Sequence, residues 1–282
     1  MTDYYGIANN TFVTNASANN KVYDGSTKAI ISINQLELTG LIAGEIVDID
    51  TVSAVFASKD IGNALSVSLD FARIKGAQSP NYSITIDGAP LSSASISPKQ
   101  IQIVNTIAKD KVYDASLVAS LNQIGQLGGL IGTETLVLNA PTNVVFTDKN
   151  AGNGKQVKAF AYSISDGANG GIAQNYSLLA DSVETTASIS KAPLSVNATN
   201  HVIIVNDVAY SGGNGVTYQG FVGGENESVL GGTLAYSGTS QGAILPGTYS
   251  IIPDGLSSSN YELSFKEGSL TIQDIPYGTN PT

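Results

Sequence analysis

The 282-residue sequence has no cysteine, no tryptophan, one methionine and one histidine. Without cysteine, the chain forms neither disulfides nor thiolate metal sites. No apolar run approaches the roughly 18 residues that a membrane-spanning helix needs, and no segment has the pattern of a signal peptide. Because Met1 is the only methionine and precedes a polar, turn-rich segment, we expect the sequence to be a piece of a longer protein.

Charge is also scarce, since charged residues make up only 13% of the chain where roughly a quarter is usual. Ser, Thr, Asn and Gly take their place, and these residues favour strands and turns over helices. The net charge of −10 means that phosphate backbones and anionic membrane surfaces would repel the chain. We therefore expect no nucleic-acid partner and no membrane insertion, whereas hard cations such as calcium remain compatible partners.

Internal repeats are the strongest feature of the sequence. Four blocks recur in the same order, and the first two recur at a spacing of 90 residues. With their second copies, the blocks are Lys-Val-Tyr-Asp at 21–24 and 111–114, the segments 56–63 and 146–153, Asn-Tyr-Ser at 81–83 and 175–177, and Ala-Ser-Ile-Ser at 94–97 and 187–190. This order predicts two copies of one module.

A third, more divergent copy follows. The turn sequence Gly-Leu-Ile-Ala-Gly-Glu at 40–45 matches Gly-Leu-Ile-Gly-Thr-Glu at 129–134 and Gly-Phe-Val-Gly-Gly-Glu at 220–225. An Asn-Tyr pair follows this turn in every copy. The residues that we assign to the structural repeat motif are Tyr23, Asp24, Tyr113, Asp114, Asn81, Tyr82, Asn175, Tyr176, Asn260 and Tyr261.

The repeats predict three modules in tandem, at residues 18–98, 99–193 and 194–275. Residues 1–17 are then a lead-in from a preceding segment, and residues 276–282 are the truncated start of a further module. Pro98 and Pro193 stand at the joints, and no Gly/Ser linker separates the modules. Joints of this kind favour a stiff, elongated rod.

The hydrophobic pattern predicts an all-β chain. Leu65, Val67, Leu69 and Phe71 alternate with polar residues, and this period of two is typical of half-buried strands. No amphipathic helix is evident. We expect three β-sandwich-like, Ig-like modules, and the alternative is a compact β-grasp-like fold for each module.

The first two modules resemble the YDG domain through Lys-Val-Tyr-Asp-Gly at 21–25, the Asn-Tyr strand and the Ala-Ser-Ile closing strand. The third is similar to the MBG domain through Ala-Tyr-Ser-Gly-Gly at 209–213, the turn at 220–225, Pro-Gly-Thr-Tyr at 246–249 and Gly-Ser-Leu-Thr-Ile at 268–272. Such domains occur as repeats in large filamentous-haemagglutinin-like surface adhesins of Gram-negative bacteria.

The resemblance implies a secreted or cell-surface, outer-membrane-associated adhesin that is exported by two-partner secretion. It supplies no enzyme activity and no cofactor. One departure stands out, because the second copy has Ala115 where the first has Gly25. Asp-Gly is a strong signal for a type I′ hairpin. Either the turn differs in the second copy, or Tyr-Asp is retained for an Asp-capped turn against the ring.

Candidate sites for chemistry are few. His201, in a strand context, is the only histidine available to a nucleophile–histidine pair, and we interpret it as an ordinary strand residue. Asp48, Asp50 and Asp60 are calcium candidates, because oxygen ligands suit calcium and residues two apart in a strand share a face. The second copy lacks these acidic residues at 136–139, which favours a solvated acidic face.

Three further readings concern the repeated residues. The recurring Lys and Asn residues are compatible with an intramolecular isopeptide bond, and Asn81 and Asn175 match the Asn-x-Ser glycosylation pattern. The 13 tyrosines could form a platform that stacks sugars. Their recurrence at equivalent positions, with Tyr210 as the third equivalent of Tyr23 and Tyr113, favours internal packing instead.

We therefore expect a monomeric structural stalk, or spacer, within an adhesin that supports cell attachment or biofilm formation, with neighbouring modules of the same chain as its partners. The alternative is a segment that binds carbohydrates or host and matrix proteins directly. An enzyme is not expected.

Overall fold

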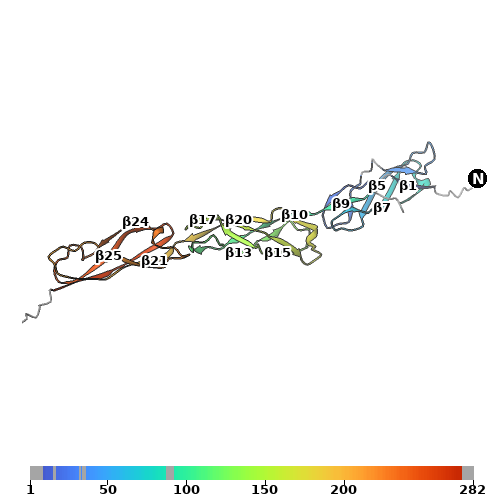
Figure 1. Cartoon of the computed structure of the whole chain (residues 1–282). Helices are drawn as coiled ribbons and strands as arrows, with labels where there is room; N and C mark the ends of the chain where they lie inside the picture. The colour runs from blue at the N-terminus through green and yellow to red at the C-terminus, as the bar shows by residue number, and fades with distance from the viewer. Residues whose placement is uncertain (1–8, 15–16, 32, 34–35, 87–91, 275–282) are drawn as a thin grey trace, which may run out of the picture. The chain divides into compact units, whose positions relative to one another are not determined.

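The computed structural model describes residues 9–14, 17–31, 33, 36–86 and 92–274 (Figure 1). These residues form β-strands, and their helical turns are short 3-10 turns. The all-β prediction is confirmed. A β-grasp module would place a helix across its sheet, whereas no α-helix occurs within the described ranges. None of the helices in these ranges has the length and apolar character of a membrane span.

Each module begins with a strand that lies between an antiparallel and a parallel neighbour. The three sheets, each written with the first strand in the middle, are β4 (Glu37–Thr39), β1 (Asn9–Thr14) and β8 (Tyr82–Thr85); β14 (Gln126–Gly128), β10 (Lys99–Val104) and β19 (Tyr176–Leu178); and β23 (Val216–Gln219), β21 (Ala192–Ala198) and β26 (Tyr261–Lys266). The Asn-Tyr motif thus starts the parallel neighbour in all three modules.

Strand β1 corrects the predicted lead-in. Its residues 9–12 pair in parallel with β8, and residues 12–14 pair antiparallel with β4, so they belong to module 1. The equivalent strand β10 shares no obvious sequence block with β1, and the repeat search therefore did not reveal the match. Residues 1–8 and the predicted truncated start at 276–282 lie outside the described residues.

The last strand of each module pairs in parallel with a short strand that carries, in the first two modules, the Lys-Val motif. These pairs are β9 (Ala94–Ser97) with β2 (Lys21–Val22), β20 (Ser182–Ser190) with β12 (Lys111–Val112), and β27 (Gly268–Gln273) with β22 (His201–Ile204).

The remaining elements complete the second layer of each module or connect its strands. They are β3 (Lys28–Ala29), β5 (Asp48–Phe56), β6 (Gly62–Leu65), β7 (Val67–Lys75), η2 (Ser79–Asn81), β11 (Ile107–Ala108), β13 (Leu121–Gln123), β15 (Leu136–Asn139), β16 (Asn143–Phe146), β17 (Gly152–Phe160), β18 (Ser163–Asp166), η3 (Ala173–Asn175), η4 (Glu227–Val229), β24 (Gly231–Ser237) and β25 (Gly247–Ser257).

The chain divides into two compact units that do not coincide with the sequence modules. Unit 1 comprises residues 1–104, 125–140 and 162–181, and unit 2 comprises residues 105–124, 141–161 and 182–282. Each unit therefore contains one junction between successive modules. We call the junction of modules 1 and 2, within unit 1, joint 1, and that of modules 2 and 3, within unit 2, joint 2.

The hydrophobic core of each unit continues across its joint. In unit 1, Tyr23 and Phe56 of module 1 share one buried cluster with Ile101 and Tyr176 of module 2. In unit 2, a corresponding cluster combines buried residues of modules 2 and 3, among them Tyr113, Phe146, Ile189, Leu194 and Tyr261. Because burial of apolar area stabilises a fold in proportion to that area, the joints add to the stability of the modules on both sides.

The backbone crosses each joint with a single residue between strands. Strand β9 ends at Ser97 and β10 begins at Lys99, so that Pro98 alone separates them. At joint 2, β20 ends at Ser190 and β21 begins at Ala192. Pro193 therefore lies inside β21 rather than between the strands. Neither connection leaves a flexible linker.

Candidate functional site: the joints between modules

The centre of joint 1 is the carboxylate of Glu134. Tyr23 of module 1 donates a hydrogen bond to Glu134 Oε1 at 2.7 Å, and Tyr176 of module 2 donates one to Glu134 Oε2 at 2.6 Å. The two rings meet edge to face with their centroids 5.4 Å apart. Lys59 Nζ of module 1 lies 3.2 Å from the Tyr23 hydroxyl and 3.5 Å from Glu134 Oε1. One carboxylate thus joins tyrosines from two modules.

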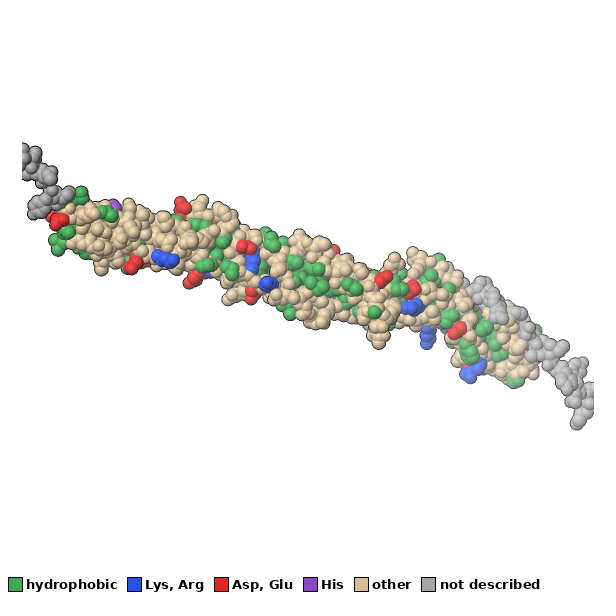
Figure 2. Space-filling model, turned by 90° about the horizontal axis from the view of Figure 1, so that it is seen from below, with side chains coloured by type: hydrophobic (Ala, Val, Ile, Leu, Met, Phe, Trp, Pro, Cys, Tyr) green, Lys and Arg blue, Asp and Glu red, His purple; other side chains and the backbone are tan. Residues whose placement is uncertain are grey.

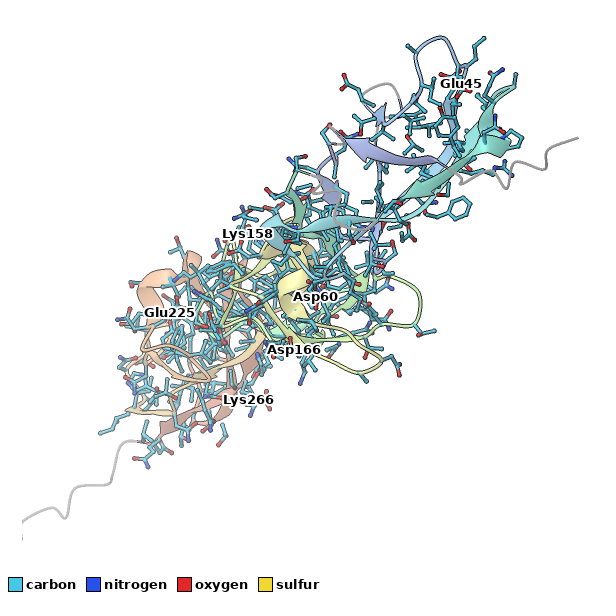
Figure 3. All side chains as sticks on the ribbon, turned by 90° about the vertical axis from the view of Figure 1, so that its right-hand side faces the viewer. Glu45, Asp60, Lys158, Asp166, Glu225 and Lys266 are labelled. Atoms are coloured by element: carbon cyan, nitrogen blue, oxygen red, sulfur yellow. The ribbon has the colours of Figure 1, made fainter. Side chains whose placement is uncertain are left out.

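Joint 2 repeats this arrangement around Glu225, which is labelled in Figure 3. Tyr113 of module 2 donates to Glu225 Oε1 at 2.8 Å, and Tyr261 of module 3 donates to Glu225 Oε2 at 2.7 Å. The ring centroids are 5.5 Å apart, and Lys149 Nζ lies 3.7 Å from Glu225 Oε1. The same chemistry therefore recurs at both joints.

The asparagine of the Asn-Tyr motif forms a second set of hydrogen bonds at each joint. Asn175 Oδ1 accepts the Ile61 N–H at 2.9 Å, and its Nδ2 donates to Asp60 Oδ1 at 2.8 Å. In joint 2, Asn260 makes the equivalent two bonds to residues 150–151, both at 3.0 Å. Asn175 is fully buried, and a buried amide without these partners would be costly.

The joint geometry shifts the pKa values of its acidic groups in opposite directions. Burial alone would raise the pKa of Glu134, but the hydrogen bonds from its two tyrosines and the charge of the nearby lysine hold it below its ordinary value. The same balance lowers the pKa of Glu225. Burial and, next, the hydrogen bond to the carboxylate raise the pKa of Tyr176 and of Tyr113 to about 12.

These shifts predict that the joints lose stability at both ends of the pH range. A lowered carboxyl pKa contributes stability above the ordinary value of 4.5 that is lost as the pH falls through the folded-state pKa. A raised tyrosine pKa contributes stability below pH 10 that is lost as the pH rises toward about 12. Urea unfolding at about pH 3, 7 and 11 should give its highest free energy at the middle value. A free energy that does not fall toward pH 11 would contradict the tyrosine assignment.

A tight turn positions each glutamate. In all three modules the glutamate N–H bonds to the carbonyl three residues earlier: Glu45 to Ile42 at 3.1 Å, Glu134 to Ile131 at 3.0 Å and Glu225 to Val222 at 3.1 Å. The turn has two central residues, and a residue with positive φ is glycine in every module. In module 1 it is the second central residue, Gly44, and in module 2 the first, Gly132. In module 3 both central residues, Gly223 and Gly224, have positive φ. Three turn geometries therefore serve one function, which explains why these two positions vary while the glutamate recurs.

A buried lysine holds the Tyr-Asp segment in place. Lys21 Nζ donates to Asp24 Oδ1 at 2.8 Å and to the carbonyls of Ser26 and Lys28 at 2.7 and 2.9 Å, and it lies 5.4 Å from the centre of the Phe56 ring. Lys111 makes the same set of contacts in module 2. The Lys-Val-Tyr-Asp motif is therefore a local bond network that presents its tyrosine to the next module.

We expect Lys21→Met to lower the free energy of unfolding of unit 1 by about 1–3 kcal/mol, because it removes the ammonium group that bonds to Asp24 and to two backbone carbonyls. Lys28→Met is the matched control, since Lys28 is exposed, and its cost should stay within about 0.5 kcal/mol. Urea titrations of both variants measure the difference. Equal costs would show that the Lys21 contacts do not stabilise the motif.

The structure decides between the two readings of the Tyr-Asp turn. The Ser26 N–H and the Ser116 N–H each bond to the preceding aspartate Oδ1 at 2.9 Å, so both copies form an Asp-capped turn. Only one central residue has positive φ, Gly25 at 77° and Ala115 at 64°. The segment is not a type I′ hairpin, because it connects β2 to β3, which pair with different strands. Ala115 occupies the left-handed region because the aspartate contacts fix the turn.

Module 3 departs from the predicted tyrosine. The residue that bonds to the last strand, as Tyr23 and Tyr113 do, is Val205, whose N–H lies 2.9 Å from the Gln273 carbonyl. Tyr210, which the sequence suggested as the third equivalent, instead places its hydroxyl 3.0 Å from His201 Nδ1. The mismatch arises because the sequence comparison aligned tyrosines, whereas the strand register aligns Val205.

The calcium and catalytic candidates lie in strands β5 and β22 and in joint 1. Asp50 Oδ2 accepts a bond from Arg73 Nε at 2.7 Å, Asp48 begins β5, and Asp60 binds Asn175 in joint 1. No group of three or more His, Cys, Asp or Glu side chains gathers in the ranges that the structure describes. His201 is the first residue of β22, and its ring contacts the Tyr210 hydroxyl.

The burial of the repeated residues bears on two predictions, glycosylation of the asparagines and sugar stacking on the tyrosines. Asn175 is fully buried and its amide is bonded on both sides, so glycosylation there would require opening joint 1, whereas Asn81 is exposed. The rings of Tyr23, Tyr113 and Tyr261 are at most 2% exposed. Rings buried in this way present no platform for sugars.

Sequence reasoning identified the tyrosines and asparagines of the joints but not the residues that connect them. Glu134 and Glu225 appeared only as the ends of a turn motif, and Lys59 and Lys149 only as part of a repeated block. The available signal was the recurrence of an acidic residue at the end of the turn in all three copies.

Two solved structures show only a weak likeness to this chain. Drosophila N-cadherin EC1-3 matches with 10% identity and a TM-score of 0.23, covering 93% of this chain and 99% of that chain. The N-terminal four Ig domains of Dscam1 isoform 7.44 match with 10% identity and a TM-score of 0.21, covering 92% and 72%. With scores this low, neither likeness supports an argument about function. The comparison with curated proteins finds no match.

The comparison with family models is decisive. The YDG domain model matches residues 8–90 and 97–187, which together make up more than half of the chain. The model of the MBG domain (YGX type) matches residues 194–271. Both families are repeat domains of surface-adhesin-like proteins. The chain therefore belongs to the YDG domain family, with two YDG domains followed by one MBG domain.

Proposed function

We propose that this chain is a structural stalk segment of a secreted bacterial surface adhesin, in which each joint fixes one module on the next. The observation that carries the proposal is the recurrence of one Tyr–Glu–Tyr arrangement, with its lysine and asparagine, at both joints. Divergent modules that retain the same contact at their junctions are suited to transmitting force and holding spacing, which is what a stalk requires.

The proposal includes the partners, the oligomeric state and the location of the chain. Its partners are neighbouring modules of the same polypeptide, the chain is a monomer that lies outside a Gram-negative cell, and it needs neither a cofactor nor catalysis. On the face drawn in Figure 2, the few acidic and basic side chains are interspersed along the chain and do not gather into a patch of one sign. A surface of this kind supports a spacer better than a site for a charged ligand.

Small-angle X-ray scattering of the full chain tests the stalk directly. Modules of about 30–40 Å joined end to end predict a particle of roughly 100 Å and a radius of gyration of roughly 30 Å. A compact globule of this length would have a radius of gyration of about 19 Å, and that value would refute the proposal.

Direct ligand binding is the competing function. A glycan and matrix-protein array probed with the full chain should show no saturable binding if the chain is a spacer. Saturable binding that survives 0.15 M salt, where weak surface electrostatics are screened, would favour the binding alternative instead.

A further inference from the structure

At each joint, a glutamate and the tyrosine of the Asn-Tyr motif bind the tyrosine of the preceding module. Module 1 carries its own copy of this glutamate and tyrosine. Tyr82 donates a hydrogen bond to Glu45 Oε2 and accepts the Ile42 N–H at 2.9 Å. Tyr176 makes the same two contacts, with Glu134 and with the Ile131 N–H at 3.1 Å. Figure 3 shows Glu45 and Asp60 at opposite ends of module 1, so this copy lies away from joint 1.

The copy in module 1 is more exposed than the two joints, and no tyrosine of another module contacts it within the described residues. At joints 1 and 2 the glutamate Oε1 accepts a bond from the tyrosine of another module, whereas Glu45 Oε1 has no such partner within the described residues. Ile42 is 53% exposed, whereas its equivalent Ile131 packs against the core cluster of unit 1. Asn81 is exposed, whereas Asn175 is fully buried. We call Ile42, Glu45, Asn81 and Tyr82 the Glu45 face.

We propose that the Glu45 face binds the tyrosine-bearing end of another YDG-type domain. The incoming tyrosine would donate to Glu45 Oε1, and a backbone N–H of the loop that matches residues 59–61 would donate to Asn81 Oδ1. These are the bonds that joints 1 and 2 make with the same residue types. The inference stands apart from the stalk proposal, because it rests on the residues of one module.

Close packing narrows the choice of partner to an end with glycine after Tyr-Asp. In joint 2, a Cβ placed on Gly223 would lie 2.6 Å from the Ala115 Cβ, so alanine on one side is matched by glycine on the other. In joint 1, a Cβ placed on Gly25 would lie 2.9 Å from Ile131 Cγ2, and the Glu45 face has Ile42 at the position equivalent to Ile131. A Tyr-Asp-Gly end, like that of residues 23–25, therefore fits better than a Tyr-Asp-Ala end.

A second copy of this chain, docking through module 3, is a poorer partner. Val205 stands where the donating tyrosine would be, so that end offers no hydroxyl to Glu45. Burying a carboxylate oxygen without a donor is costly. We therefore expect the chain by itself to remain monomeric in sedimentation experiments, and a dimer that Glu45→Gln disrupts would overturn this choice of partner.

The test places a known tyrosine-bearing end against the Glu45 face by fusing a second copy of residues 9–98 directly before residue 9, since Asn9 pairs with Tyr82 as Lys99 pairs with Tyr176. Glutamine replaces one carboxylate oxygen by an NH2 donor, so that the hydroxyl of Tyr82 keeps an acceptor but a second tyrosine hydroxyl would meet a donor. In the original chain, Glu45→Gln should change the folding equilibrium constant by less than about threefold. In the extended chain the same substitution should lower it by about tenfold or more, and Glu134→Gln should have an effect of the same size in the original chain. Equal effects of Glu45→Gln in both chains would refute the proposal.

Two controls identify the source of any coupling. Tyr23→Phe in the added copy alone should remove the extra sensitivity to Glu45→Gln, because the donor is then absent. Repeating residues 192–274 ahead of the chain, in place of residues 9–98, should give no extra sensitivity, because that end carries Val205. Coupling that persists in either control would show that the tyrosine is not what the face recognises.

A measurement on the original chain keeps the inference testable if the extended chain does not fold. Ile42→Ser should leave the unfolding midpoint in urea nearly unchanged, whereas Ile131→Ser should lower it clearly, because only Ile131 packs against another module. Equal losses would show that the Glu45 face is already covered, and the proposal would fail.

Discussion

Replacing Tyr23 by alanine is expected to lower the free energy of unfolding of unit 1 by about 3–5 kcal/mol. The ring is 1% exposed and packs edge to face on Tyr176, and its hydroxyl is bonded to Glu134. Its removal leaves a cavity inside a core that both modules share, and it also removes one donor from the largely buried carboxylate of Glu134. Urea unfolding followed by far-ultraviolet circular dichroism measures the loss.

Two controls separate the ring from its hydroxyl and from aromatic content in general. Tyr23→Phe keeps the ring and should cost only about 1 kcal/mol. Phe71→Ala removes an aromatic side chain that is 52% exposed in β7, and it should cost about 0.5 kcal/mol or less. A loss for Tyr23→Ala no larger than that for Phe71→Ala would mean that joint 1 does not stabilise unit 1.

Replacing Glu225 by alanine is expected to lower the free energy of unfolding of unit 2 by about 2–4 kcal/mol. The substitution takes the acceptor away from two tyrosine hydroxyls, those of Tyr113 and Tyr261, and the counter-charge away from Lys149. Burial raises the pKa of both tyrosines further above neutral pH, so both hydroxyls stay protonated and both lose their acceptor.

Glu184→Ala is the matched control in the same unit. Glu184 also pairs with a lysine, at 2.8 Å, but both side chains are about half exposed, and exposed ion pairs contribute little. Its cost should be several-fold smaller than that of Glu225→Ala. If both substitutions cost the same, the Glu225 contacts amount to no more than a surface ion pair.

The module repeat and the all-β class were predictable from the sequence, because both depend on local patterns. Alternation identifies strands such as β7, and recurring blocks identify copies. Strand β1 was not predictable in this way, since its pairing with β8 depends on backbone bonds that many side chains allow. The Tyr-Asp turn was only half predictable, because Ala115 adopts a conformation that the aspartate contacts impose.

The joints were the least predictable part of the site. Tyr23, Glu134 and Tyr176 are each visible as repeated residues, but repetition alone does not show that a tyrosine of one copy meets the glutamate of the next copy rather than its own. The position of Val205 shows the same limit, because only the strand register identifies it as the counterpart of Tyr23.

Distance measurement by double electron–electron resonance tests the central claim, that each joint fixes one module on the next. Because the chain has no cysteine, Ser68→Cys in module 1 and Val137→Cys in module 2, both exposed positions of unit 1, give a single pair of spin labels. A fixed joint predicts one narrow distance distribution, which broadens when Tyr23→Ala is added. A broad distribution in the chain with Tyr23 intact would contradict the account.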